Sequence, residues 1–127
     1  MNFKELTDKI RKLPPIWIGE YNIDYLKRFL DGWLCYEEMN KINDCEFSAM
    51  FGYYFSWWLH NKMRIENCEL YFKNKCGLGM DYTHIIKVLE KNPKEQIALF
   101  FELLDEYYEA CVSGINFEEI KDKLLHK

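Results

Sequence analysis

Apolar residues recur every three or four positions along most of the chain, and this spacing constrains the fold more than any other feature of the sequence. In the longest such run, Ile97, Phe100, Phe101 and Leu104 fall on one side of a helix. The spacing predicts an all-α protein, and a mass of 15.5 kDa is that of a single compact domain over residues 1–127, with about five or six helices. The expected helices are residues 3–13, 23–40, 45–62, 82–90, 93–112 and 117–125.

Prolines and polar capping residues indicate where these helices begin and end. Pro14 and Pro15 should end the first helix, because proline lacks the backbone N–H and restricts the residue before it. Residues 16–19 are then expected to form a short extended connector. Residues 63–80 are the least regular part of the chain, and within them 69–72 could form a brief strand or a helical turn. The expected N-caps are Asn22, Asp81 and Asn92, and the long helix is expected to end at Gly114.

The expected core includes four aromatic residues: Trp33, Phe51, Phe55 and Phe101.

Three features of the sequence predict the cellular compartment of the protein. No apolar run approaches the roughly 18 residues that a membrane span needs. The N-terminal residues are amphipathic and charged, without the apolar region of a signal peptide. The five cysteines are odd in number and form no CxxC pair, so we expect reduced thiols. These features predict a cytoplasmic protein without a membrane partner.

No residue set in the sequence specifies a reaction, so we expect no catalytic residues and no enzyme. His60, Cys68, Cys76 and His84 follow one another at intervals of eight, whereas zinc ligands usually lie two to four residues apart within each pair. The stretch CGLG lacks the Lys-Ser/Thr ending and the preceding strand of a phosphate-binding loop. We therefore expect no metal site and no cofactor.

The negative charge is concentrated near the C-terminus. Residues 93–127 hold eight acidic and four basic residues, which accounts for the net charge of −4, and a chain with this balance is a poor nucleic-acid binder. The candidate partner-binding residues form one stripe of the long helix: Glu102, Asp105, Glu106 and Glu109. No base at positions 98, 99, 101 or 103 relieves them, so the stripe is either a solvated face or a docking site for a basic partner. The next candidates, in the irregular segment, are Arg64, Glu66, Glu69 and Tyr71.

The aromatic residues allow two readings. Trp17, Trp33, Trp57 and Trp58 could line a pocket, but their helical spacing favours core packing. Trp57 and Trp58 are neighbours on one helix and cannot easily both enter one core. One of them is therefore expected to be partly exposed and available to a partner.

The stretch Pro15-Ile-Trp-Ile-Gly19, followed by a helix that carries Phe29-Leu-Asp-Gly-Trp33, resembles a pattern in small bacterial immunity proteins. The later stretch FFELLDEY, residues 100–107, is similar to the C-terminal part of proteins of the same class. These proteins protect a cell against its own contact-dependent growth-inhibition or other polymorphic toxin. The resemblance implies a protein that binds a cognate toxin domain, for example a nuclease, and blocks it by stoichiometric occlusion. The alternatives are a helical adaptor or regulatory protein with another basic partner and, third, a small enzyme.

Overall fold

The computed structural model describes residues 2–40, 51, 54–77 and 79–125 of the chain. Within these ranges it contains eight helices and no strand, so the all-α prediction is confirmed, while the helix number exceeds the expected five or six. The helices are α1 (Phe3–Lys12), α2 (Pro14–Ile18), α3 (Ile23–Met39), α5 (Tyr54–Glu66), α6 (Cys68–Lys73), α7 (Tyr82–Leu89), α8 (Pro93–Ser113) and α9 (Phe117–Leu125).

The two additional helices lie where the sequence pattern is weakest. The extended connector expected at residues 16–19 is wrong, because Pro14 and Pro15 occupy the first positions of α2. Proline is tolerated there, since the first N–H groups of a helix have no partner within the helix. Gly19 ends α2 with a φ of 91°, a conformation that side chains disfavour. Of the two alternatives for residues 69–72, the helical one is confirmed, because they belong to α6.

The expected helix boundaries are largely confirmed. Each predicted N-cap side chain accepts a hydrogen bond from a backbone N–H of the first turn, as Asn92 does from Lys94 and Glu95. Gly114 ends α8 in the left-handed conformation. For the helix expected at 45–62, residues 45–50 and 52–53 lie outside the described residues, and α5 continues four residues beyond the expected end to Glu66.

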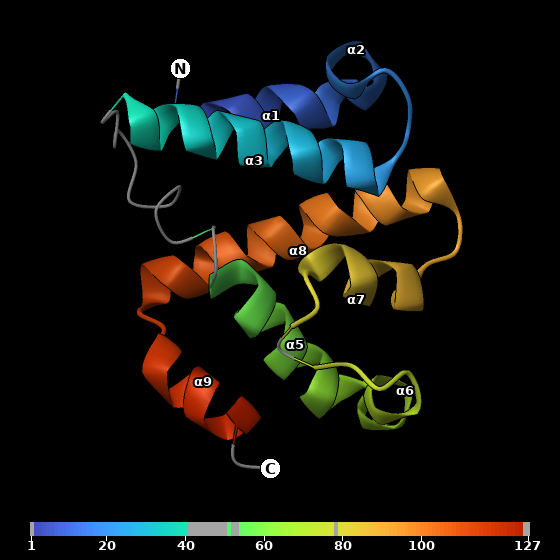
Figure 1. Cartoon of the computed structure of the whole chain (residues 1–127), viewed down its shortest axis with the longest axis vertical. Coiled ribbons are helices and arrows are strands. Elements are labelled where there is room, and N and C mark those ends of the chain that lie inside the picture. The colour runs from blue at the N-terminus through green and yellow to red at the C-terminus, as the bar shows by residue number, and fades with distance from the viewer. Residues whose placement is uncertain (1, 41–50, 52–53, 78, 126–127) are drawn as a thin grey trace.

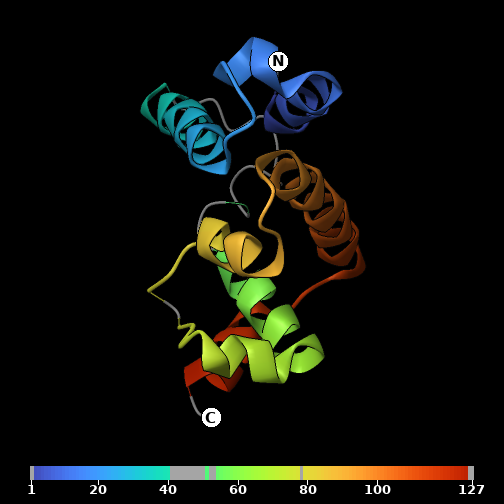
Figure 2. The ribbon, with the colours of Figure 1, turned by 90° about the vertical axis from the view of Figure 1, so that its right-hand side faces the viewer.

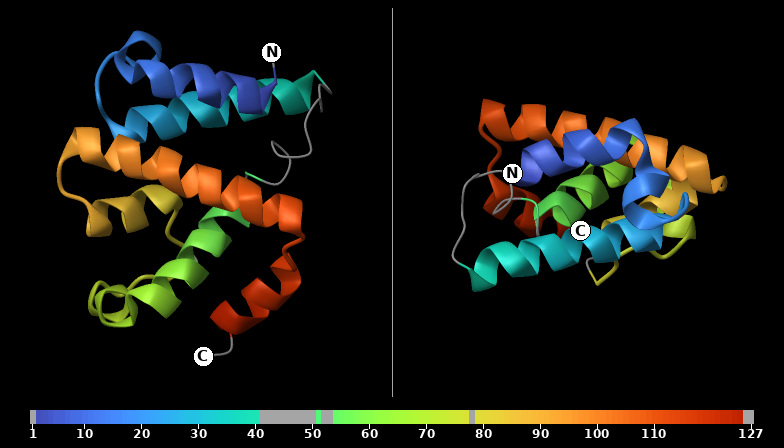
Figure 3. Two further views of the ribbon diagram at one scale, coloured as in Figure 1. Left: turned by 180° about the vertical axis from the view of Figure 1, so that it is seen from behind. Right: turned by 90° about the horizontal axis from the view of Figure 1, so that it is seen from above.

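The helices are arranged in three tiers with α8 across the middle (Figure 1). At one end, α1 and α3 run in opposite directions and are joined through α2 (Figures 1 and 2). At the other end, α5 packs against α6 and α9, and α5 also contacts α7 and α8. The described ends of the chain therefore lie far apart (Figure 3). No helix in the described ranges is both long enough and apolar enough to cross a membrane.

Aromatic rings fill the centre of the core. Phe55 is fully buried, and its ring packs against five others, those of Phe51, Trp58, Tyr82, Phe100 and Tyr107. Phe51, Phe55 and Phe101 are buried as predicted. Trp33 is only partly buried and packs against the outside of this cluster. The core thus fixes which face of α8 points inward, and with it the face that is left exposed.

Candidate functional site

The sequence of α8 determines which of its side chains reach solvent. Its buried side chains follow the helical period, because Ile97, Phe100, Leu104 and Tyr107 all enter the core. The four acidic candidates occupy the opposite face, and each of them is exposed: Glu102, Asp105, Glu106 and Glu109. We call these four residues the acidic stripe. The structure therefore places them on one surface, as their spacing predicted.

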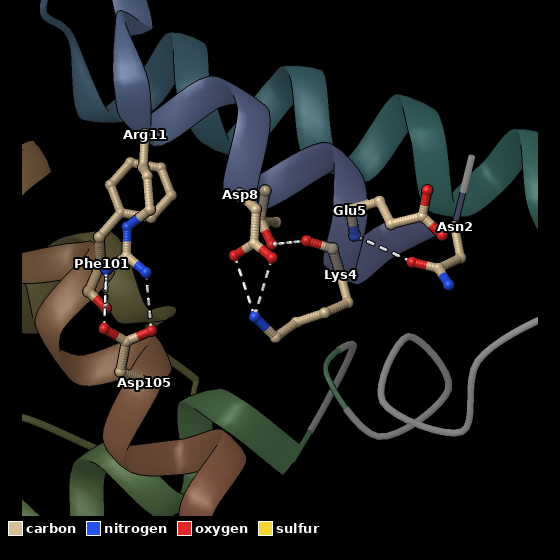
Figure 4. Close-up of polar contacts among 8 residues, drawn as sticks. Asn2, Lys4, Glu5, Asp8, Arg11, Phe101 and Asp105 are labelled. Carbon is tan, nitrogen blue, oxygen red and sulfur yellow. Dashed lines mark hydrogen bonds and ion pairs between the residues drawn. The ribbon is translucent and has the colours of Figure 1, made fainter.

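Asp105 is not an unpaired acid. Arg11, in the last turn of α1, donates hydrogen bonds from both terminal nitrogens to the two carboxylate oxygens of Asp105, at 2.8 Å each (Figure 4). This hydrogen bonding, opposed by partial burial and assisted by charge attraction, holds the pKa of Asp105 below its ordinary value. The pKa of Arg11 is raised by the same bonds. The base that pairs with Asp105 therefore comes from α1 and not from α8 itself.

Glu106 is also paired, with Lys62 of α5. The Nζ atom of Lys62 lies 2.9 Å from a carboxylate oxygen of Glu106 and 2.7 Å from one of Glu66. Burial alone would lower the pKa of Lys62, but the hydrogen bonds and attraction of the two carboxylates outweigh it, so the pKa is raised. Arg11 and Lys62 belong to other helices, so the sequence of α8 alone does not indicate these pairs.

Glu102 and Glu109 remain as the charged ends of the acidic stripe. Both side chains are exposed, and neither forms an ion pair with another residue of the described ranges. They lie seven residues apart, or about 10 Å along the axis at 1.5 Å per residue. The stripe therefore presents two carboxylates to solvent, with two further carboxylates held between them by neighbouring helices.

The alternative candidates at 63–80 do not form one surface. Arg64 donates to the backbone oxygen of Lys123, and Glu66 pairs with Lys62. Tyr71 is buried, so it is not available to a partner. Glu69 is exposed and borders a shallow depression of about 540 Å³ at the junction of α5 and α6. Only Glu69 and this depression remain as candidates in the segment.

The histidine and cysteine set is not gathered into a site. His60 is fully buried, with Nε2 2.7 Å from the backbone oxygen of Met80 and Nδ1 3.2 Å from the hydroxyl of Tyr71. Since a carbonyl oxygen only accepts, Nε2 carries the proton, and Nδ1 accepts from Tyr71. No group of three or more potential metal ligands occurs among the residues that the structure describes. His60 is thus a structural residue that joins α5 to α6 and to the loop before α7.

Trp57 and Trp58, which are neighbours on α5, pack against different residues. Trp58 packs against Phe55 and Tyr107 of the core. Trp57 packs against Tyr54 on its own helix, and Lys121 of α9 lies over its ring with Nζ 5.3 Å from the centroid. Both are partly buried, so neither is a fully exposed anchor for a partner.

Comparison with protein-family models, curated proteins and solved structures finds no match to this chain. Its function has to be inferred from its own residues, of which the acidic stripe is the best-defined surface feature.

Proposed function

We propose that this chain is an immunity protein that binds a cognate bacterial toxin domain and neutralises it by stoichiometric occlusion. The observation that carries the proposal is the exposed pair Glu102 and Glu109 on one rigid helix. The pair flanks two carboxylates whose positions are fixed by Arg11 and Lys62. The exposed pair adds negative charge that no base of the described ranges compensates, and such charge attracts and orients a basic surface.

A nuclease is the toxin class that this surface fits best. An enzyme that cleaves nucleic acid binds phosphates, and its groove therefore carries lysine and arginine side chains. An acidic helix face laid over that groove would compete with the phosphates and exclude the substrate. The excess of acidic residues in positions 93–127 supports the same charge complementarity.

Co-expression tests the proposal directly. The proposal predicts a gene for the toxin beside the gene for this chain, and the toxin domain of that neighbouring gene is expressed in bacteria with and without the chain while growth is recorded. Restored growth together with a one-to-one complex in size-exclusion chromatography is the expected result. A stable complex that leaves the toxin active would favour the helical adaptor, and the absence of both complex and protection would refute the proposal.

A further inference from the structure

A cleft of about 310 Å³ lies on the surface between the end of α1, the turn after α2 and the first half of α8. Its volume is within the range of small-molecule sites. Three cationic side chains line it, Arg11, Lys12 and Lys94, and no acidic residue does. This charge is opposite in sign to that of the acidic stripe, so the cleft is suited to a different kind of ligand.

Two of the three cations have charge available for a ligand. Arg11 is already engaged by Asp105. Lys12 and Lys94 form no ion pair within the described ranges, and both are exposed. Lys94 is held near the cleft by Tyr21, because its Nζ atom lies 5.5 Å from the ring centroid. An anion between Lys12 and Lys94 would be attracted by both.

The rest of the cleft is apolar and partly aromatic. Phe101 and Ile97 are buried side chains of α8 that contribute to its wall, and Tyr21 adds a half-buried ring from the other side. The guanidinium of Arg11 lies over the Phe101 ring, with Cζ 5.1 Å from the centroid, so its flat face covers the ring and forms this part of the wall. Flat walls of this kind favour stacking of a planar group.

We propose that this cleft binds a small anionic molecule with a planar apolar body, such as an aromatic carboxylate, sulfonate or phosphate. The anion lies between Lys12 and Lys94, and the ring system lies against Tyr21 and the guanidinium of Arg11 that covers Phe101. The inference is independent of the proposed toxin, since it uses another surface of the protein and a ligand of opposite charge.

The test uses a pair of fluorescent probes that differ only in charge. 8-Anilinonaphthalene-1-sulfonate carries the anion, and N-phenyl-1-naphthylamine has the same ring system without it. Fluorescence titration of the folded chain should give saturable binding of the sulfonate, with at least about tenfold weaker binding of the neutral probe, equivalent to about 1.4 kcal/mol. Equal binding of the two probes, or no saturable binding of the sulfonate, would overturn the proposal.

Variants then locate the probe. The double variant Lys12→Gln/Lys94→Gln should weaken sulfonate binding by about tenfold or more, whereas the control Lys9→Gln/Lys73→Gln removes two exposed lysines elsewhere and should bind as the wild type does. Ala98 lines the cleft and is exposed, so Ala98→Phe should fill it and abolish binding without disturbing the core. Circular dichroism confirms that each variant is folded. If the two double variants bind equally, or if Ala98→Phe binds unchanged, the site is elsewhere and the inference is wrong.

Discussion

Arg11 and Asp105 are joined by two parallel hydrogen bonds although 94 positions separate them in the sequence. The same guanidinium donates to the backbone oxygen of Phe101 at 3.1 Å and covers its ring (Figure 4). One side chain of α1 therefore contacts α8 through charge, hydrogen bonding and stacking together. This contact fixes the position of a carboxylate in the acidic stripe, and it also forms one wall of the cationic cleft.

Replacing Arg11 tests the strength of this contact. Arg11→Ala should lower the free energy of unfolding by about 1–2 kcal/mol, because it removes a bidentate ion pair and the stacking on Phe101. The estimate is small because both charged groups are partly exposed to solvent. Urea unfolding followed by circular dichroism gives the value. Lys12→Ala, which removes a neighbouring exposed charge without an ion pair in the described ranges, should stay within about 0.5 kcal/mol; equal losses in both variants would show that the contact contributes nothing.

The ion pair of Asp105 should make the free energy of unfolding depend on pH. The pKa of Asp105 is lower in the folded protein than in the unfolded chain. The contribution of its ion pair to the free energy of unfolding is therefore complete above the unfolded pKa of about 4, and it disappears as the pH falls through the folded pKa. Asp105→Asn should therefore be less stable than the wild type at pH 7, and this difference should shrink below about pH 4. Urea midpoints measured from pH 7 down to pH 2.5 test this. In Glu102→Gln, which lacks such a pair, no comparable difference should be present at pH 7.

Tyr71 and His60 form the second polar contact with a measurable consequence. Tyr71→Phe removes the hydroxyl that donates to Nδ1 of the fully buried His60 imidazole. This variant should lower the free energy of unfolding by about 1–3 kcal/mol. Tyr36→Phe changes an exposed hydroxyl in the same way and should stay within about 0.5 kcal/mol. Chemical unfolding of the two variants side by side decides the matter, and a Tyr71→Phe protein as stable as Tyr36→Phe would contradict the assigned role of the hydroxyl.

The parts of the fold that local chemistry determines could be predicted from the sequence. Asn22 and Asn92 cap their helices because a short side-chain oxygen reaches the first-turn N–H groups from that position alone. The buried face of α8 followed from its period. Pro14 and Pro15 were misleading, because the same residues that end one helix can begin another.

The parts that depend on helix packing could not be predicted. The spacing of Glu102, Asp105, Glu106 and Glu109 correctly placed them on one exposed face. It could not reveal that Arg11 and Lys62 pair with two of them, since those contacts are made only after distant helices pack together. The last turn of α1 holds three basic residues, Lys9, Arg11 and Lys12. Positive charge at a helix end is favourable in itself, so nothing in the local sequence shows that one of them also pairs with a distant acid.

The pairing of Asp105 and Glu106 changes which variants test the proposed toxin contact. Reversing Glu106 would break its pair with Lys62 and place two cations together, so a loss of binding could result from a loss of stability. Glu102 and Glu109 have no such pairs in the described ranges, which makes Glu102→Lys/Glu109→Lys the better substitution. Its free energy of unfolding should stay within about 0.5 kcal/mol per site of the wild type.

The same double variant should bind the toxin domain more slowly. Exposed charges at an interface act mainly on the association rate, so we expect the rate to fall by about tenfold at low salt and its salt dependence to flatten. Protection in the growth assay should weaken in parallel. Stopped-flow association at two salt concentrations gives both quantities, with Glu20→Lys/Glu38→Lys, which reverses two exposed acids outside α8, as the control with the same change of net charge. If the double variant associates and protects as the wild type does, the acidic stripe is only a solvated face, and the toxin contact has to be sought around Glu69 and the depression between α5 and α6.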